Sequence, residues 1–103
     1  MAAALEVPAL SMPPDASKLI NALNHPLRRR ILFAYLDGSV ECASAAEVAT
    51  VLDQRVGQVA YHLKTLARGE ILRPVPNQGW ALEVEPDWLR VVLEVWAGAE
   101  VAG

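Results

Sequence analysis

The sequence has little of what builds disulfide frameworks, membrane spans or export signals. Cys42 is its only cysteine, which excludes an intramolecular disulfide and favours the cytoplasm. No apolar run approaches the roughly 20 residues that cross a bilayer. The first 15 residues lack a basic region followed by a continuous apolar stretch, so we expect no signal peptide. These absences predict a soluble, cytoplasmic protein without membrane contact.

The sequence also lacks the residue spacings of common catalytic and metal sites. No Ser-His-Asp, HExxH or phosphate-loop pattern is present, so we do not expect an enzyme. His25 and His62 are far apart and have one cysteine between them, which does not predict a zinc site. Cys42 is open to two interpretations, a redox sensor or an inert small side chain, and we favour the second. We therefore expect no metal ion and no cofactor, and no residue identifies a small-molecule inducer.

The sequence does contain enough apolar residues for one globular domain. Of its 103 residues, 53% are hydrophobic and 20% are charged, as is typical of a soluble domain. Residues 1–14 include three prolines and no periodic pattern, so we predict a flexible N-terminal arm there. The predicted domain covers residues 15–103.

Helix and turn signals divide this domain into seven elements. Asp15 is a candidate N-cap, Pro26 suits the first turn of a helix, and Gly38 ends that helix. Ser44 and Glu47 form a capping box at the start of another. The predicted helices cover 16–24, 26–37, 44–52, 56–68 and about ten residues from 86, and the predicted strands cover 70–75 and 80–85 around the turn PNQG. This order predicts a mainly α fold with a small two-stranded β-hairpin, the winged helix-turn-helix (α-α-α-α-β-β-α).

Apolar spacing predicts which side of the two central helices is buried. In the helix over 56–68, apolar residues recur at i, i+3, i+7 and i+10, which makes one helical stripe of Val56, Val59, Leu63 and Leu66. In the helix before it, the expected inward residues are Val48, Val51 and Leu52. The polar side of the 56–68 helix then faces away from the core.

Charge is distributed unevenly along this acidic chain, whose net charge is −3. Residues 26–37 and 54–78 are basic blocks between acidic ones, and small nucleic-acid-binding domains often have such a local basic footprint. Chance gives the same pattern in blocks this short. However, no carboxylate occurs between Asp53 and Glu70, whereas an ordinary solvated helix mixes both signs. This depletion favours phosphate binding by the 56–68 helix.

The outward side of that helix supplies the candidate DNA contacts. The major groove accommodates one α-helix, and the first half of a reading helix usually reaches base edges. The candidate base-reading residues are Arg55, Gln58 and Tyr61, with Gly57 beside them. The candidate backbone contacts are Lys64, Thr65 and Arg68 further along the helix, Arg73, Asn77 and Gln78 on or beside the hairpin, and Arg29 and Arg30 in the first basic block. The alternative interpretation is a solvated polar face without a partner.

The last helix carries more apolar surface than a domain of this size needs. One side of it is lined by Trp88, Val91, Val92, Val95 and Trp96, with Leu89 and Leu93 toward the other side. Part of this surface covers the core, and we expect the remainder to form a homodimer, because exposed apolar patches usually mark partner surfaces. In the alternative interpretation, both tryptophans seal the core of a monomer.

Two segments carry a family resemblance. In LNHPLRRRILFAYL (23–36), a leucine, a short polar pair, a proline and arginines precede an isoleucine-leucine; AAEVATVLDQRVGQVAYHLKTLARGEIL (45–72) contains a histidine-leucine, x-x-leucine run that ends in glycine and a strand. Together they resemble the arsenic-repressor-type (ArsR) winged-helix regulators, over about residues 17–85. The resemblance implies a dimeric bacterial or archaeal transcription regulator that binds double-stranded DNA with the 56–68 helix. It also implies dimerisation through the first and last helices, which adds Leu19 and Ile20 to the dimer candidates.

The chain departs from this family pattern at two places. Ala60 stands where the family often has a serine that binds a phosphate, and ECASAAEVA offers only Cys42 in place of a paired-cysteine metal box. Two functions remain: a sequence-specific DNA-binding transcription regulator, as a homodimeric repressor, or a winged-helix protein–protein interaction module that has lost DNA binding. The carboxylate-free face favours the first. Ala60, Gly57, the short hairpin and the acidic net charge support the second.

Overall fold

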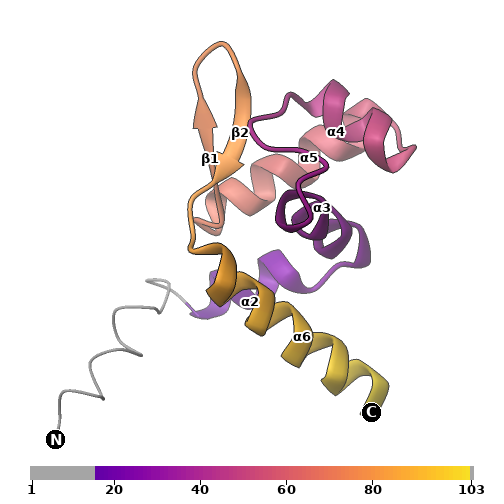
Figure 1. Cartoon of the computed structure of the whole chain (residues 1–103), viewed down its shortest axis with the longest axis vertical. Helices are drawn as coiled ribbons and strands as arrows, with labels where there is room; N and C mark the ends of the chain where they lie inside the picture. Colours follow the sequence, from indigo (N-terminus) through magenta and orange to yellow (C-terminus); the bar gives the residue numbers. More distant parts are fainter. Residues whose placement is uncertain (1–15, 103) are drawn as a thin grey trace, which may run out of the picture.

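The computed structural model describes residues 16–102, with side chains over residues 19–95, so the predicted arm 1–14 and the candidate cap Asp15 lie outside the described residues. The elements follow the order α2 (Ala16–Leu23), α3 (Pro26–Leu36), α4 (Ala45–Leu52), α5 (Val56–Arg68), β1 (Leu72–Val75), β2 (Gly79–Leu82) and α6 (Pro86–Ala102). This order confirms the predicted winged helix-turn-helix fold, with the hairpin as the wing (Figure 1).

The predicted bounds agree best with the structure for α4 and α5, the two helices of the helix-turn-helix. α5 begins and ends where its periodicity predicts, and α4 follows the predicted capping box directly. The strands are shorter than predicted, at four residues each, because the chain leaves the ladder after Leu82. α6 is longer than predicted, at 17 residues, since no proline interrupts the chain after Pro86.

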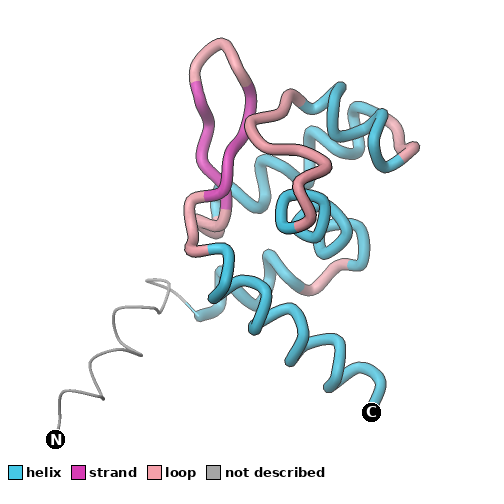
Figure 2. Tube along the Cα trace, in the orientation of Figure 1, coloured by secondary structure: helices cyan, strands magenta, loops and turns pink. Residues whose placement is uncertain are grey.

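α3 is the central helix, as its apolar residues on several sides predict. It packs against α2, α4, α5 and α6 (Figure 2). Ile31 and Leu32 are fully buried, whereas Phe33 remains exposed on the outer side of the helix. The fully buried side chains of the core come from every helix and from the start of the wing: Leu23, Ile31, Leu32, Val48, Val59, Leu63, Leu66, Ile71, Leu72, Leu89 and Leu93.

Two of the predicted inward residues are wrong. Val51 is 47% exposed and Val56 is 49% exposed. Val51 lies in the last turn of α4, where this short helix extends past the core, and Ala49 is buried beside Val48 instead. Val56 is the first residue of α5, at the edge of the turn. The buried stripe of α5 therefore starts one turn later, at Val59.

The apolar sides of α6 differ from the prediction. Leu89 and Leu93 are fully buried and cover the core, although we expected them toward the other side. Trp88 and Val92 are half-buried at the edge of that contact, so Trp88 only partly seals the core. The side chain of Trp96 lies outside the described residues. Leu89 and Leu93 are four residues apart on one side of α6, and they bury more apolar area than the neighbouring valines. This explains why the leucine side, and not the valine side, faces the core.

The wing is attached to the segment before α4 by backbone hydrogen bonds. β1 and β2 pair antiparallel, and Ala43 forms a bridge with Trp80: the Ala43 amide donates to Trp80 O at 3.1 Å and the Trp80 amide donates to Ala43 O at 2.9 Å. The Tyr35 hydroxyl also donates to Trp80 O, at 2.7 Å. Burial, with smaller contributions from Cys42 and Glu47, raises the pKa of Tyr35, so this phenol stays a donor at neutral pH.

Gly79→Ala tests this attachment. A Cβ at Gly79 would lie 2.2 Å from Ala43 O, and the residue has a φ of +136°. We expect the substitution to lower the free energy of unfolding by roughly 3 kcal/mol, because both the backbone conformation and the close approach exclude a side chain. Urea denaturation followed by tryptophan fluorescence measures the change. Gly38→Ala is the matched control: Gly38 also has positive φ, but nothing lies within 4 Å, so it loses about 1 kcal/mol. Equal losses for both variants would contradict the close approach.

Candidate nucleic-acid interface

The helix-turn-helix is built from α4, the turn 53–55 and α5. Ser44 Oγ accepts from the Glu47 amide at 3.1 Å, and Glu47 Oε1 accepts from the Ser44 amide at 2.8 Å, which confirms the capping box. Asp53 ends α4 with a φ of +56°, and the Gln54 amide donates to Ala49 O at 2.9 Å. These bonds hold the turn closed, and α4 then packs along α5.

The beginning of α5 differs from the beginning of α4. Its N-cap residue, Arg55, makes no side-chain capping bond, and no acidic residue lies in the first turn. The first amides of a helix have no partner within the helix, and they carry the positive end of its dipole. The start of α5 therefore presents uncapped donors and an arginine to its surroundings, which suits an anionic partner.

The exposed side of α5 contains most of the predicted DNA contacts. Besides the apolar Val56, its exposed residues, with the N-cap, are Arg55, Gly57, Gln58, Tyr61, Lys64 and Arg68. Tyr61 is 59% exposed, although aromatic rings are usually covered. Among the described residues, Arg55 and Lys64 have no ion pair or hydrogen bond through their side chains. This reading face, as we name these six residues, therefore carries two cations that have no partner within the described part of the chain.

Thr65 is the exception among the predicted contacts on this helix. It is only 4% exposed, so its predicted place on the outward side is wrong. Its hydroxyl donates to Tyr61 O at 3.1 Å and accepts from Arg68 Nη2 at 3.1 Å. Position 65 lies beside the buried Leu66, and the hydroxyl satisfies the backbone of its own helix. Thr65 therefore does not belong to the reading face.

The two arginines predicted from the first basic block bind carbonyl oxygens at helix ends. Arg29 Nη1 donates to Leu23 O at 2.7 Å at the end of α2, and its side chain is half-buried. Arg30 Nη2 donates to Leu52 O at 3.3 Å at the end of α4 and remains exposed. Both positions match the preference for cations at helix C-termini. Arg30 thereby lies next to the turn that leads into α5, whereas Arg29 is held at α2.

The predicted wing residues differ in their contacts: Arg73 is in an ion pair, whereas Asn77 and Gln78 lie exposed in the turn. Arg73 Nε lies 3.2 Å from Glu83 Oε1, and both side chains are about half exposed, so the charge of Arg73 is shared with a carboxylate. Asn77 and Gln78 are exposed in the turn, where Asn77 has a φ of +67° and the Gln78 amide donates to Val75 O at 3.0 Å. The tip of the wing is therefore polar rather than basic.

A polar cluster is buried behind α5, and the burial of Arg28 in it was not predicted from the sequence. Arg28 is 7% exposed and His62 is 4% exposed, and Arg28 Nη1 lies 3.1 Å from His62 Nδ1. Helical spacing contains the signal, since Arg28 precedes the buried Ile31 and Leu32 by three and four positions. The run of three arginines concealed it. His25 is the N-cap of α3, because its Nδ1 accepts from the Leu27 amide at 3.1 Å.

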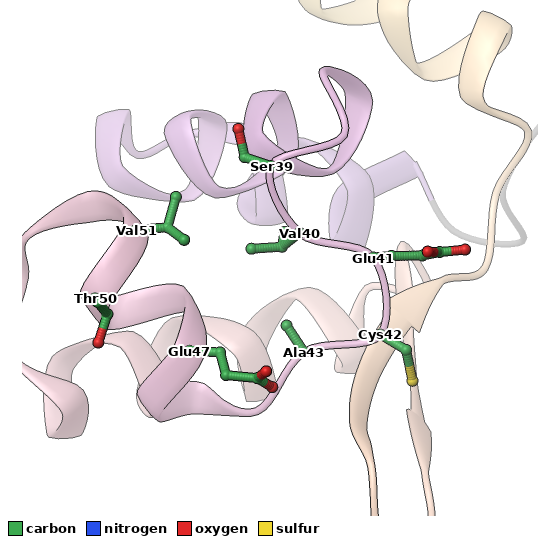
Figure 3. Close-up of a pocket in the computed structure, with 8 residues that line it drawn as sticks. All are labelled: Ser39, Val40, Glu41, Cys42, Ala43, Glu47, Thr50 and Val51. Atoms are coloured by element: carbon green, nitrogen blue, oxygen red, sulfur yellow. The ribbon is translucent and has the colours of Figure 1, made fainter.

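Cys42 lies beside an open hollow of about 570 Å³ between the segment before α4 and α4 itself (Figure 3). Ser39, Val40, Glu41, Cys42, Ala43, Glu47, Thr50 and Val51 line it. The thiol points toward the strands of the wing. Across residues 16–102, no group of three or more His, Cys, Asp and Glu side chains is placed to hold a metal ion. In the same residues, no helix combines the length and apolar character of a membrane span.

The predicted dimer residues leave an apolar surface on α2 and α6. Ile20, Val91 and Val95 are 52%, 58% and 66% exposed. Leu19, Trp88 and Val92 are half-buried. In Figure 1, both helices lie in the lower part of the molecule, away from the tip of the wing and from α4. A partner on this surface would leave the reading face open.

Comparison with protein families matches residues 23–75 to a helix-turn-helix domain. This stretch runs from the last residue of α2 to the end of β1, and it contains α3, α4 and α5. It covers just over half of the chain. No curated protein and no solved structure matches the chain.

Gly57→Ala tests how open the start of the reading face is. Nothing lies within 4 Å of a Cβ built at Gly57, so alanine fits without displacing a neighbour. We expect the variant to raise the free energy of unfolding by roughly 0.5–1 kcal/mol, because glycine costs that much relative to alanine in a helix. Urea denaturation measures the change. A loss of stability would mean that the protein itself fills the space beside this glycine.

Proposed function

The chain belongs to the helix-turn-helix domain family, and we propose that it is a sequence-specific DNA-binding transcription regulator that inserts α5 into the major groove. The observation that carries the proposal is the reading face of α5, where two cations have no ion pair or hydrogen bond among the described residues and no carboxylate occurs between Asp53 and Glu70. A helix of this kind fits the width of the major groove. Phosphates bind the cations, and the polar side chains read the base edges.

The residues of the reading face fall into two groups along the helix. Arg55, Gln58 and Tyr61 lie in the first half, and they are our candidates for base contacts, since arginine pairs well with guanine and glutamine with adenine. Gly57 lies between them and leaves room for the close approach of a sugar-phosphate backbone. Lys64 and Arg68 lie in the second half and suit phosphates.

Backbone contacts outside α5 come from the turn and the wing. Arg30 is exposed beside the turn into α5 and is our further phosphate candidate. Asn77 and Gln78 at the tip of the wing would donate to phosphates or sugars. Arg73 is a weaker candidate, because its guanidinium must either leave Glu83 or bind Glu83 and a phosphate together. Arg29 and Thr65 are not retained, since Arg29 is half-buried and Thr65 is buried, and both bond within the protein, whereas Arg30 and Arg68 remain exposed.

We propose that the regulator is a homodimer joined through α2 and α6. Ile20, Val91 and Val95 expose apolar area that a second copy would cover, and a two-fold dimer is the commonest soluble assembly. Two copies would present two α5 helices to successive turns of one DNA face. The resemblance to ArsR-type regulators supports this arrangement, a role as a repressor, and work in the cytoplasm.

One observation favours a protein–protein interaction module instead. The wing tip has no unpaired cation, and Ala60 offers no hydroxyl to a phosphate, so fewer groups hold DNA than in a strongly basic domain. In that case the reading face would bind an acidic protein. We prefer DNA because Arg55 and Lys64 flank exposed polar side chains and no carboxylate occurs between Asp53 and Glu70. The alternative becomes the conclusion if no duplex binds at low salt.

Selection of bound duplexes from random DNA tests the proposed function. We expect the protein to enrich a near-palindromic sequence, and Arg55→Ala and Gln58→Ala to relax the preference at single positions, at a cost of about 1–3 kcal/mol each. Lys64→Ala should weaken binding to all duplexes alike and reduce the salt slope by about one. Fluorescence anisotropy at several salt concentrations measures both effects.

Arg90→Ala is the matched control for lost charge, because Arg90 lies on α6, where it pairs with Asp87 at 3.2 Å. It removes one cation far from the reading face and should leave the salt slope unchanged. Unchanged sequence preference in both Arg55→Ala and Gln58→Ala would overturn the assignment of base contacts.

Val95→Glu tests the dimer. Val95 is 66% exposed, so a glutamate there leaves the folded monomer intact but places a charge in the proposed interface. Light scattering coupled to size exclusion should show a dimer for the unmodified chain and a monomer for the variant. Glu94→Gln, one residue away, removes a charge at an exposed site and should leave the dimer unchanged. If the unmodified chain and Val95→Glu were both monomers, dimerisation through α6 would be contradicted.

A further inference from the structure

The buried cluster behind α5 links three helices through one side chain. Arg28 lies on α3, and its Nε and Nη2 donate to Ala22 O and Asn21 O of α2, each at 2.8 Å. Its Nη1 lies 3.1 Å from Nδ1 of His62 on α5. Arg28 is 7% exposed and His62 is 4% exposed, so water does not substitute easily for these bonds. The position of α5 relative to α2 and α3 therefore depends on a polar contact as well as on apolar packing.

This contact requires a particular protonation state of His62. A guanidinium has only donors and stays charged at all relevant pH values. The Nδ1 atom of His62 must therefore be the acceptor, so the ring is neutral and carries its proton on Nε2. A protonated ring would direct an N–H at the guanidinium, which breaks the hydrogen bond and places two cations 3.1 Å apart in a buried site.

Among the residues that the structure describes, no negative charge faces His62 to offset such a repulsion. Arg28 faces it from α3, the His25 ring lies tilted beside it with ring centroids 4.4 Å apart, and the Tyr61 ring makes a T-shaped contact with it at 5.3 Å. Burial lowers the pKa of His62, and His25 and Arg28 lower it further. His25 Nδ1 accepts from the Leu27 amide at 3.1 Å, so that ring also bonds through an unprotonated Nδ1.

Tyr61 connects the cluster to the reading face. Its ring is 59% exposed on the outer side of α5 and packs on the edge of the buried His62 ring. A change in the orientation of His62 therefore removes the support beneath a proposed base-reading side chain. The same change loosens α5 from α2 and α3, because Arg28 loses its contact on α5.

We propose that Arg28 and His62 are positioning residues for the reading helix, and that protonation of His62 releases α5 and weakens DNA binding. The neutral ring holds α5 and Tyr61 in the orientation that fits the groove, and the protonated ring does not. The inference rests on the proposed function for its DNA readout. The positioning itself is a property of the protein alone.

The direction of the pKa shift sets the pH window. An unperturbed histidine titrates near 6.5, and His62 in the folded protein titrates below that value. Between these two pH values the unfolded chain binds more protons than the folded one, so stability rises with pH there. The contribution of the cluster is complete above about pH 6.5, and it is lost as pH falls toward the lowered pKa of the folded state.

Three substitutions separate positioning from simple structural loss. In His62→Gln, the amide oxygen accepts from Arg28 but does not titrate. In His62→Leu, no acceptor remains and the guanidinium is left with an unpaired donor. His25→Asn is the matched control, because asparagine is a good N-cap and the substitution removes the other imidazole of the cluster. Folding of each variant is checked by circular dichroism.

The first measurement needs no DNA. Nitrogen-15 NMR of the histidine rings at about pH 8 should find the proton of His62 on Nε2, as the hydrogen bond to Arg28 requires. Urea denaturation between about pH 5 and 8 should show that the unmodified chain and His25→Asn lose stability in acid, whereas His62→Gln loses less. A proton on Nδ1 at about pH 8, or equal acid sensitivity of His62→Gln, would overturn the positioning role.

The second measurement uses the duplex recovered by selection. Affinity of the unmodified chain should fall relative to that of His62→Gln once the pH is below the lowered pKa of His62, by about tenfold for each further pH unit, since each unit reduces the neutral fraction tenfold. His25→Asn should keep the fall, and His62→Leu should bind weakly even at about pH 8. Loss of the pH dependence in His25→Asn instead of His62→Gln would overturn the proposal. Failure of the unmodified chain to bind any duplex at about pH 8 and low salt would reject the proposed function, while the NMR and unfolding results would still decide the positioning.

Discussion

The contact on which the rest of the molecule depends is the burial of the inner side of α5 against the core around α3. Val59, Leu63 and Leu66 are fully buried there, and each such side chain contributes about 2 kcal/mol when it leaves water. Because a helix is rigid, burying one side fixes the direction of the other. The outward orientation of Gln58, Tyr61 and Lys64 follows from this packing, to which the contact between Arg28 and His62 adds a polar connection.

The two helices of the helix-turn-helix, α4 and α5, differ at their N-termini, and the difference bears on the proposed function. α4 closes its first amides with the Ser44–Glu47 capping box, which stabilises the helix by about 1 kcal/mol. α5 leaves its first turn without a side-chain cap, without an acidic residue and with a glycine at its second position. Natural helices forgo such stabilisation mainly where the termini have another partner. A phosphate or a base edge would be that partner here.

Polar groups inside this domain act as connectors between elements rather than as isolated exceptions. Tyr35 joins α3 to the wing through Trp80 O, Arg30 joins α3 to the end of α4, and Arg28 joins α3 to α2 and α5. Each bond runs from α3 to another element, so together they tie the wing, α4, α5 and α2 to the central helix. Buried polar contacts are costly unless satisfied, so they specify one arrangement of the elements more sharply than apolar packing does.

The sequence by itself determined the order of the elements, the capping box, the extent of α5 and the exposure of Arg55, Gln58 and Lys64, because these depend on spacing and on local hydrogen bonds. Only the tertiary structure decided which of two adjacent apolar faces of α6 meets the core, since Leu89 and Val92 lie on neighbouring faces that periodicity cannot rank. It also decided that Thr65 is covered and that Arg28 is buried. A charged or hydroxylated side chain becomes buried only where other elements bring carbonyls or a histidine within hydrogen-bond distance, and those partners are distant in the chain.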